Sequence, residues 1–324
     1  MAGTFYNQIA ANRRNSFLLA LIVVALLGAL GFTIGFALTG EPVGGVATTG
    51  VAVAIGSLLA VGSYFGGDKL VLSVSGARAV TEASAPQLMN VVREMSIAAN
   101  VPMPAVYVID DTAPNAFATG RDPKHASIAV TTGLLQKLDR EELQGVIGHE
   151  LSHVRNFDIR FSLIVGVLVG SIALLADFFL RWTWFGGSSR RGRDRDGGGG
   201  AAAIIMVVAI ILAIVAPIVA RFVQMAVSRQ REYLADASAI DLTRNPYGLE
   251  RALAKISTDA EVLEVANRAT QHLYFVNPIK KWEERASGLM STHPPVVERV
   301  NRLRELSGSP PLDLRTMSGA TDLG

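Results

Sequence analysis

The apolar stretch FLLALIVVALLGALGFTIGFA at residues 17–37 decides the fold class of this chain. It forms the centre of residues 16–39, a run of 24 residues without a charged side chain. As a helix with a rise of 1.5 Å per residue, the run would be about 36 Å long, which is enough to cross a bilayer core. The alternative is a cleaved signal peptide, but the apolar region of such a peptide is only about 7–15 residues long. We therefore expect a transmembrane helix, preceded by a cytoplasmic tail at residues 1–15.

A second apolar run at residues 46–67 follows after a short link. It is rich in Gly, Ala, Ser and Thr, the small residues that allow transmembrane helices to approach closely. Together the two runs predict a transmembrane hairpin over residues 16–67. The basic residues that flank this hairpin are Arg13, Arg14, Lys69 and Arg78. Because the link between the runs has no Lys or Arg, the positive-inside rule places both ends of the hairpin in the cytoplasm.

The composition of the whole chain agrees with a membrane protein. Of its 324 residues, 50% are hydrophobic and only 18% are charged, and the mean hydropathy is +0.34. An average soluble domain has about 25% charged residues, so this composition excludes a disordered or solvating protein. The net charge of +2 gives no indication of a nucleic-acid partner. The absence of Cys excludes disulfides, Cys-ligated zinc and thiol chemistry.

Residues 68–158 have the pattern of a globular α+β segment. The expected elements are a helix at 85–99, strands at 105–109, 115–119 and 127–132, and a continuous helical stretch that begins at Gly133. Asp139 with Glu142 three residues later predicts a capping box within that stretch. A second soluble part is expected at 223–306 and a flexible tail at 307–324.

Residues 159–222 predict a second apolar hairpin, with apolar runs at 161–180 and 201–220. The Gly/Arg-rich loop at 181–200 joins the two runs and contains five Arg residues. Two full spans would place this loop outside the cell, which conflicts with the positive-inside rule. A shallow or re-entrant pair is therefore the alternative. We favour full spans, because the first hairpin can dominate the orientation.

The chemistry of the chain is concentrated in His149-Glu150-Leu151-Ser152-His153, an H-E-x-x-H sequence on a helical stretch. The spacing i, i+4 places both imidazoles on one helix face, where they can bind one Zn²⁺ per chain. Glu150 can then take a proton from a water whose pKa the metal lowers toward about 7. A charged amphipathic helix is the alternative, but the neighbouring side chains are apolar and would make unpaired His and Glu costly.

A catalytic zinc needs a third protein ligand, and Glu232 is the best candidate. Asp236 lies one helical turn later and is expected to accept the far N–H of a ligand histidine and to fix its tautomer. Arg229 could hold either carboxylate. A solvated helix with Arg–Glu pairing is the alternative, and His272 or His293 could replace Glu232 as the third ligand.

The sequence resembles the HtpX-type membrane zinc metalloproteases, a heat-shock protease family related to the CAAX prenyl proteases. The resemblance covers most of the chain. Its motifs, in order, are the leading hairpin, Pro114-Asn-Ala-Phe-Ala118, Ile128-Ala-Val-Thr followed by Gly-Leu-Leu, His149-Glu-Leu-Ser-His153, the apolar insertion, Ser228-Arg-x-x-Glu-x-x-Ala-Asp236 and Thr292-His-Pro-Pro295. It implies a mainly α membrane protein with a zincin-like α+β domain and a small sheet. It also implies a zinc endopeptidase in membrane-protein quality control and the stress response, in the cell (inner) membrane, with its site facing the cytoplasm.

Three further residues are candidates for contacts with substrate. Asn115 and Phe117 lie in a segment that an extended peptide could join as an added strand, although core packing is an equal explanation for Phe117. His293 could donate a hydrogen bond to the oxyanion of a tetrahedral intermediate, or could simply start a helix.

These observations favour an enzyme over a binding protein. The expected partners are the lipid bilayer and unfolded or membrane protein substrates; the sequence does not determine the oligomeric state. A catalytically silent membrane chaperone or scaffold is the alternative function, but the intact Glu150 argues against it. A metal transporter would need ionisable groups inside the apolar runs, and only Asp177 qualifies.

Overall fold

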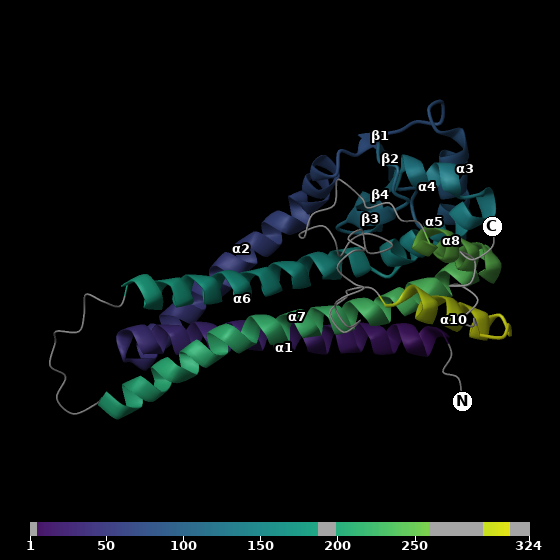
Figure 1. Cartoon of the computed structure of the whole chain (residues 1–324). Helices are drawn as coiled ribbons and strands as arrows, with labels where there is room; N and C mark the ends of the chain where they lie inside the picture. The colour runs from purple at the N-terminus through teal and green to yellow at the C-terminus, as the bar shows by residue number, and fades with distance from the viewer. Residues whose placement is uncertain (1–4, 187–198, 259–293, 312–324) are drawn as a thin grey trace, which may run out of the picture. The chain divides into compact units, whose positions relative to one another are not determined.

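The computed structural model describes residues 5–186, 199–258 and 294–311 (Figure 1). The chain forms two compact units, which we describe separately. The first unit consists of Met1–Phe65 and Ser162–Val227, and the second of Gly66–Phe161 and Ser228–Gly324. Each unit is therefore built from two segments that are distant in the sequence.

Four long helices contain the apolar runs of the sequence. They are α1 (Phe5–Thr39), α2 (Pro42–Val74), α6 (Asp158–Gly186) and α7 (Gly199–Thr243). By length and composition each is able to cross a membrane, and the candidate spans are Leu21–Thr39, Pro42–Val74, Val165–Trp184 and Ala203–Thr243. The predicted architecture of helical membrane segments is thereby confirmed.

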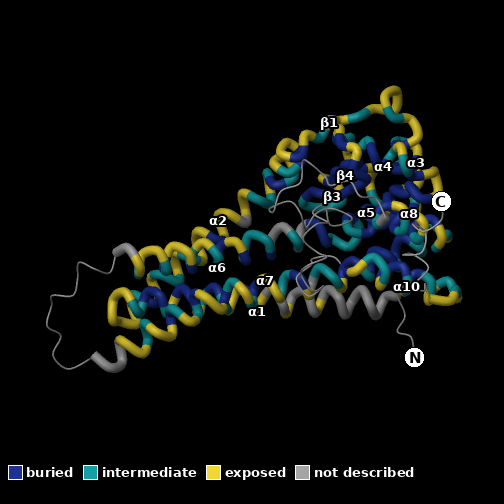
Figure 2. Tube along the Cα trace, viewed as in Figure 1, coloured by how far each residue is buried: buried dark blue, intermediate teal, exposed yellow. Residues whose placement is uncertain are grey.

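Buried and exposed residues alternate along the helices of the first unit (Figure 2), and many of the exposed residues are apolar. The buried side chains recur every three or four residues; they are Val23, Leu27, Leu30 and Ile34 on α1, and Val165, Val169, Ile172 and Ala176 on α6. Leu21 and Leu174 lie outside this pattern and are exposed. Exposed apolar surface of this extent on helices that also pack together is typical of contact with lipid.

Small residues bring α1 and α2 close together within the first unit. A Cβ atom on Gly35 would collide with the carbonyl oxygen of Gly44, so a larger residue at position 35 would push the two helices apart. Nearby, the hydroxyl of Thr49 donates a hydrogen bond of 3.3 Å to the carbonyl oxygen of Gly28. The predicted close approach of the two apolar runs is thus present in the structure.

The second unit contains a four-stranded sheet in the order β1-β2-β4-β3. The strands are β1 (Arg78–Ala79), β2 (Ala105–Ile109), β3 (Ala116–Gly120) and β4 (Ala126–Thr131). β2 and β4 are parallel, whereas β1 pairs with β2 and β3 pairs with β4 in antiparallel fashion. β3 is consequently an edge strand of this sheet.

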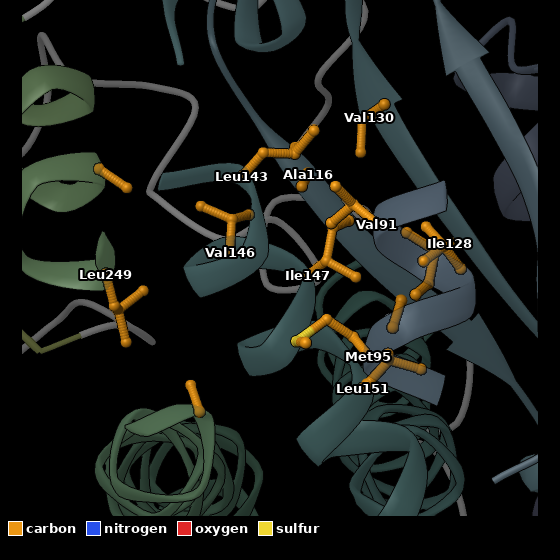
Figure 3. Packing of buried hydrophobic residues seen from close by; sticks show 14 of the residues in the cluster. Val91, Met95, Ala116, Ile128, Val130, Leu143, Val146, Ile147, Leu151 and Leu249 are labelled. Carbon is orange, nitrogen blue, oxygen red and sulfur yellow. The ribbon is translucent and has the colours of Figure 1, made fainter. Parts of the chain in front are cut away.

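Helices and the sheet together enclose the main hydrophobic core. The helices include α3 (Pro86–Ala99), α5 (Arg140–Arg155) and α8 (Pro246–Thr258). Figure 3 shows Val91, Met95 and Ile147 of these helices close to Ile128 of β4, and Leu249 of α8 belongs to the same core cluster. At Gly145 in α5 a Cβ atom would lie 2.6 Å from the backbone nitrogen of Leu249, so the close packing of α5 against α8 requires glycine.

The helical stretch that the sequence predicts from Gly133 is two helices rather than one. Helix α4 (Thr132–Lys137) ends before Leu138, whose backbone is extended, and α5 begins at Arg140. The predicted capping box causes the break: Asp139 Oδ1 accepts from the Glu142 N–H at 2.9 Å, and Glu142 Oε2 accepts from the Asp139 N–H at 2.9 Å. Because a capping residue has a non-helical backbone, the same Asp139 that starts α5 also separates it from α4.

Candidate metal centre

Helix α5 carries both histidines of the H-E-x-x-H sequence toward one point. The Nε2 atoms of His149 and His153 are 3.1 Å apart, and the two rings are arranged edge to face. His149 is buried, whereas His153 is partly exposed. The i, i+4 spacing therefore brings the two imidazoles together as one helical turn requires.

Helix α7 brings Glu232 to the same point. Its Oε2 atom lies 3.5 Å from Nε2 of His149, and its Oε1 atom lies 3.5 Å from Nε2 of His153. Ligand atoms bound to one tetrahedral zinc at about 2.0–2.2 Å are about 3.3–3.6 Å apart, so the three side chains fit such an ion. Within the described part of the chain, the ligand atoms of these three residues all lie within 4.8 Å of one another, so the residues could hold one metal ion.

Each histidine is oriented by a carboxylate at its other ring nitrogen. Asp236, on α7, lies 2.9 Å from Nδ1 of His149, and Asp158, the first residue of α6, lies 3.1 Å from Nδ1 of His153. Since an ionised carboxylate only accepts, each Nδ1–H donates and each Nε2 lone pair is directed to the metal position. Asp236 is named above, from the sequence, as a partner of a ligand histidine, whereas Asp158 is not named there.

The carboxylates of Asp236 and Glu232 are paired with Arg299, on α10 (Val296–Leu306). Its Nη2 and Nε atoms donate to the two oxygens of Asp236 at 2.7 and 2.9 Å, and Nη1 lies 3.4 Å from Glu232 Oε2. Arg229 is the arginine that the sequence suggests for this task, and the structure adds Arg299, which is not among the residues suggested above. The sequence did contain an indication that Arg299 is buried and paired: it occurs among Val296, Val300 and Leu303 on the apolar side of its helix.

Glu150 is buried, and its carboxyl group is close enough to His149, His153 and Glu232 for their charges to affect it. Burial raises the pKa of its carboxyl group, whereas the positive charge that His149 and His153 carry without metal lowers it, and the net pKa is above the usual value. The backbone N–H of Ala118, in β3, donates a hydrogen bond to this carboxylate. A carboxylate with a raised pKa is better suited to accept a proton near neutral pH.

The carboxylates also control the charge of the histidines in the absence of metal. Burial lowers the pKa of His153, but Asp158 and Glu232 outweigh burial and raise that pKa to about 10. Burial likewise opposes the charged form of His149, yet hydrogen bonds to Asp236 and Glu232 raise its pKa above the usual value. A positive ion at this position would replace those protons, as expected for a site made for a cation.

The candidate residues for substrate contacts have different positions. Asn115 is buried, and its backbone N–H and carbonyl bond to Thr131. Phe117 is fully buried in a small cluster with Leu72, Ile109, Ala113 and Ala129. His293 and the alternative ligand His272 lie outside the described residues. His125, in the short helix η1 (Pro123–His125), pairs with Asp122 at 2.8 Å and not with the three candidate ligands.

We expect Arg299→Met to destabilise the metal-free protein strongly. The change leaves Asp236 and Glu232 buried without their guanidinium partner, and breaking a buried pair on one side typically costs about 3–5 kcal/mol. Thermal unfolding of chelator-treated protein in detergent would measure the loss. Arg93→Met removes an exposed pair with Glu82 and serves as the control. An Arg299→Met protein that melts with the wild type would contradict this expectation.

Comparisons with known proteins show which proteins this chain is similar to. The model of peptidase family M48 matches residues 82–307. A "Protease HtpX homolog" from Streptococcus gordonii is 44% identical over 301 residues, which are 93% of this chain and 99% of the relative. A second relative of the same name, from Ligilactobacillus salivarius, is 42% identical over 303 residues, with the same shares of both chains. The crystal structure of Ste24p from S. mikatae aligns with a TM-score of 0.48 and 17% identity, over 92% of this chain and 67% of that one.

The match to the family model and the alignments with the relatives both cover the helices that carry His149, His153 and Glu232. The chain therefore belongs to peptidase family M48, among its HtpX-type membrane metalloproteases.

Proposed function

We propose that the chain is a zinc-dependent endopeptidase that hydrolyses peptide bonds of misfolded or damaged membrane proteins. The convergence of His149, His153 and Glu232 around one point, with the Glu150 carboxylate beside it, carries this proposal. The nitrogen and oxygen donors match the ligand preference of zinc, one ion per chain, and three protein ligands leave a position for water.

The chain's own residues have distinct tasks in this reaction. When bound, zinc would lower the pKa of a water and polarise the carbonyl of the scissile bond. Glu150 accepts the proton of the attacking water at its carboxylate and passes it to the nitrogen of the departing amine. Asp236 and Asp158 keep the two imidazoles in the tautomer that presents Nε2. His293 would donate a hydrogen bond to the oxyanion of the tetrahedral intermediate.

Edge strand β3 is the proposed binding place for the substrate chain. Among the described strands β3 pairs only with β4, and the N–H of Ala118 on its other edge is directed to Glu150. An extended peptide added along this edge would therefore pass the catalytic carboxylate. Because the Phe117 side chain is in the core and the backbone of Asn115 is bonded to Thr131, both residues would act through the position that they give to the strand.

The proposed substrates follow from the position of the ligands in the sequence. His153 lies eight residues before the apolar run that begins at residue 161, and Glu232 lies 12 residues after the run that ends at residue 220. A site connected so directly to apolar helices suits proteins that are embedded in the membrane or partly extracted from it. We place it in the cell (inner) membrane, on the cytoplasmic side.

Zinc analysis combined with cleavage of casein tests the proposed function. The full chain, purified in detergent, should contain one zinc and should cleave this unfolded substrate. A chelator should remove both metal and activity, and added zinc should restore them. A chain that binds zinc and casein without cleaving it would instead support a silent chaperone or scaffold.

Cysteine labelling tests the proposed orientation, because the natural chain has no Cys. With an impermeant reagent, Val43→Cys, at an exposed position near the start of α2, should be labelled from the outer face and Ser84→Cys only from the cytoplasm. Ser188→Cys then distinguishes two full spans from a re-entrant pair, since only full spans expose it outside. External labelling at position 84 would overturn the orientation.

A further inference from the structure

We infer that Asp158 and Arg231 form a positioning pair that holds the metal ligand His153, an inference that rests on the proposed zinc site. The carboxylate of Asp158 has two buried contacts. Its Oδ2 atom accepts from Nδ1 of His153 at 3.1 Å, and its Oδ1 atom lies 3.3 Å from Nη1 of Arg231. One carboxylate thus connects a ligand histidine to an arginine.

The backbone places Asp158 where it can reach His153. Helix α5 ends at Arg155, and Phe157 follows with a φ of +60°, a left-handed conformation that a non-glycine residue rarely adopts. This residue turns the chain between the helices, so that α6 begins at Asp158. The first residue of the third apolar helix is consequently directed back to the ligand five residues earlier.

Arg231 contacts both the side chain and the backbone of Asp158. Its Nη1 atom also donates to the backbone carbonyl of Asp158 at 3.1 Å, and both residues are buried. Arg231 immediately precedes the ligand Glu232 on α7. One helix therefore provides a metal ligand and, one residue away, the support for another ligand.

The arrangement repeats the one at the other histidine. At His149, the carboxylate of Asp236 accepts from Nδ1 and is itself held by the guanidinium of Arg299. At His153, Asp158 and Arg231 take the same places. A carboxylate that is fixed in this way orients the ring and increases its basicity, and loss of such a partner typically costs about 10–100-fold in metal affinity or activity.

Zinc affinity measured in the full-length Glu150→Gln chain tests the inference without self-cleavage. Competition with a chromophoric chelator gives the dissociation constant, and the visible spectrum of the Co²⁺-loaded protein reports the ligand geometry. Asp158→Ala should weaken zinc binding about 100-fold and alter the Co²⁺ bands. Asp158→Asn keeps an acceptor but loses the charge, so it should weaken binding about 10-fold. Arg231→Met should weaken it in the Glu150→Gln parent chain and add little to Asp158→Ala, because the two residues act as one unit.

The control variant is Asp241→Asn, which removes a partly exposed carboxylate near the end of α7 that pairs with Arg244, the residue after that helix. It should bind zinc as the parent chain does. Melting of each metal-free variant shows whether it is folded, and Asp158→Asn carries the test if Asp158→Ala does not fold. Folded Asp158 variants with the parent's zinc affinity and Co²⁺ spectrum would overturn the inference. A parent chain that binds no zinc would instead contradict the proposed function.

Discussion

Glu150→Gln is expected to retain the metal and to lose nearly all peptidase activity. The amide has almost the same shape as the carboxylate but cannot take a proton from water, and removal of a general base typically lowers the rate about 10²–10⁴-fold. Glu150 lies beside the three candidate ligands rather than among them, so zinc content should be unchanged. Casein cleavage and metal analysis on the same purified sample would test both parts.

The buried position of Glu150 calls for a fold control in this experiment. Glutamine loses no volume, and its amide oxygen can still accept from the N–H of Ala118, so the melting temperature should stay close to that of the wild type. Near-wild-type turnover would refute the proposed mechanism. Cleavage of the variant during purification would indicate a contaminating protease rather than self-cleavage.

Local patterns in the sequence were sufficient for much of the fold. The four apolar runs predicted the four long helices, because length and hydropathy are properties of a continuous segment. The strand predicted at 105–109 coincides with β2, and the one at 115–119 is shifted by one residue from β3. The capping box at Asp139 was also predictable, since both of its hydrogen bonds are formed within three residues.

Parts of the site that depend on distant contacts were not predictable in the same way. His149 and His153 share one helical turn, so their proximity follows from spacing alone. Arg299, in contrast, meets Asp236 across 63 residues of sequence, and Arg231 meets Asp158 across 73. Arg299 could not be chosen on local grounds, because only the packing of α10 on the site brings its guanidinium to Asp236. The position of the Asp158 side chain depends on the left-handed backbone of Phe157. Such a backbone is usually found at glycine, so a phenylalanine at this position does not indicate it.

Glu232→Ala is expected to lower zinc affinity sharply and to abolish activity. The change removes the carboxylate whose two oxygens lie 3.5 Å from the imidazole nitrogens of His149 and His153, and it leaves two protein ligands where a catalytic zinc takes three. It also removes a partner of Arg299, so folding must be checked by melting of the metal-free protein. Glu232→Gln is the matched variant that keeps the volume of the side chain.

Metal content should distinguish Glu232 from the other candidates for the third ligand. Zinc measured after equilibrium dialysis should be lost in Glu232→Ala and retained in His272→Ala and His293→Ala. His293→Ala should nevertheless lower the turnover number if its imidazole assists the oxyanion, because that interaction strengthens in the transition state. Asp236→Ala should have an intermediate effect, about 10–100-fold in affinity or activity, since Asp236 orients His149 without binding the metal. Tight stoichiometric zinc in Glu232→Ala, together with its loss in His293→Ala, would show that His293 is the ligand and Glu232 is not.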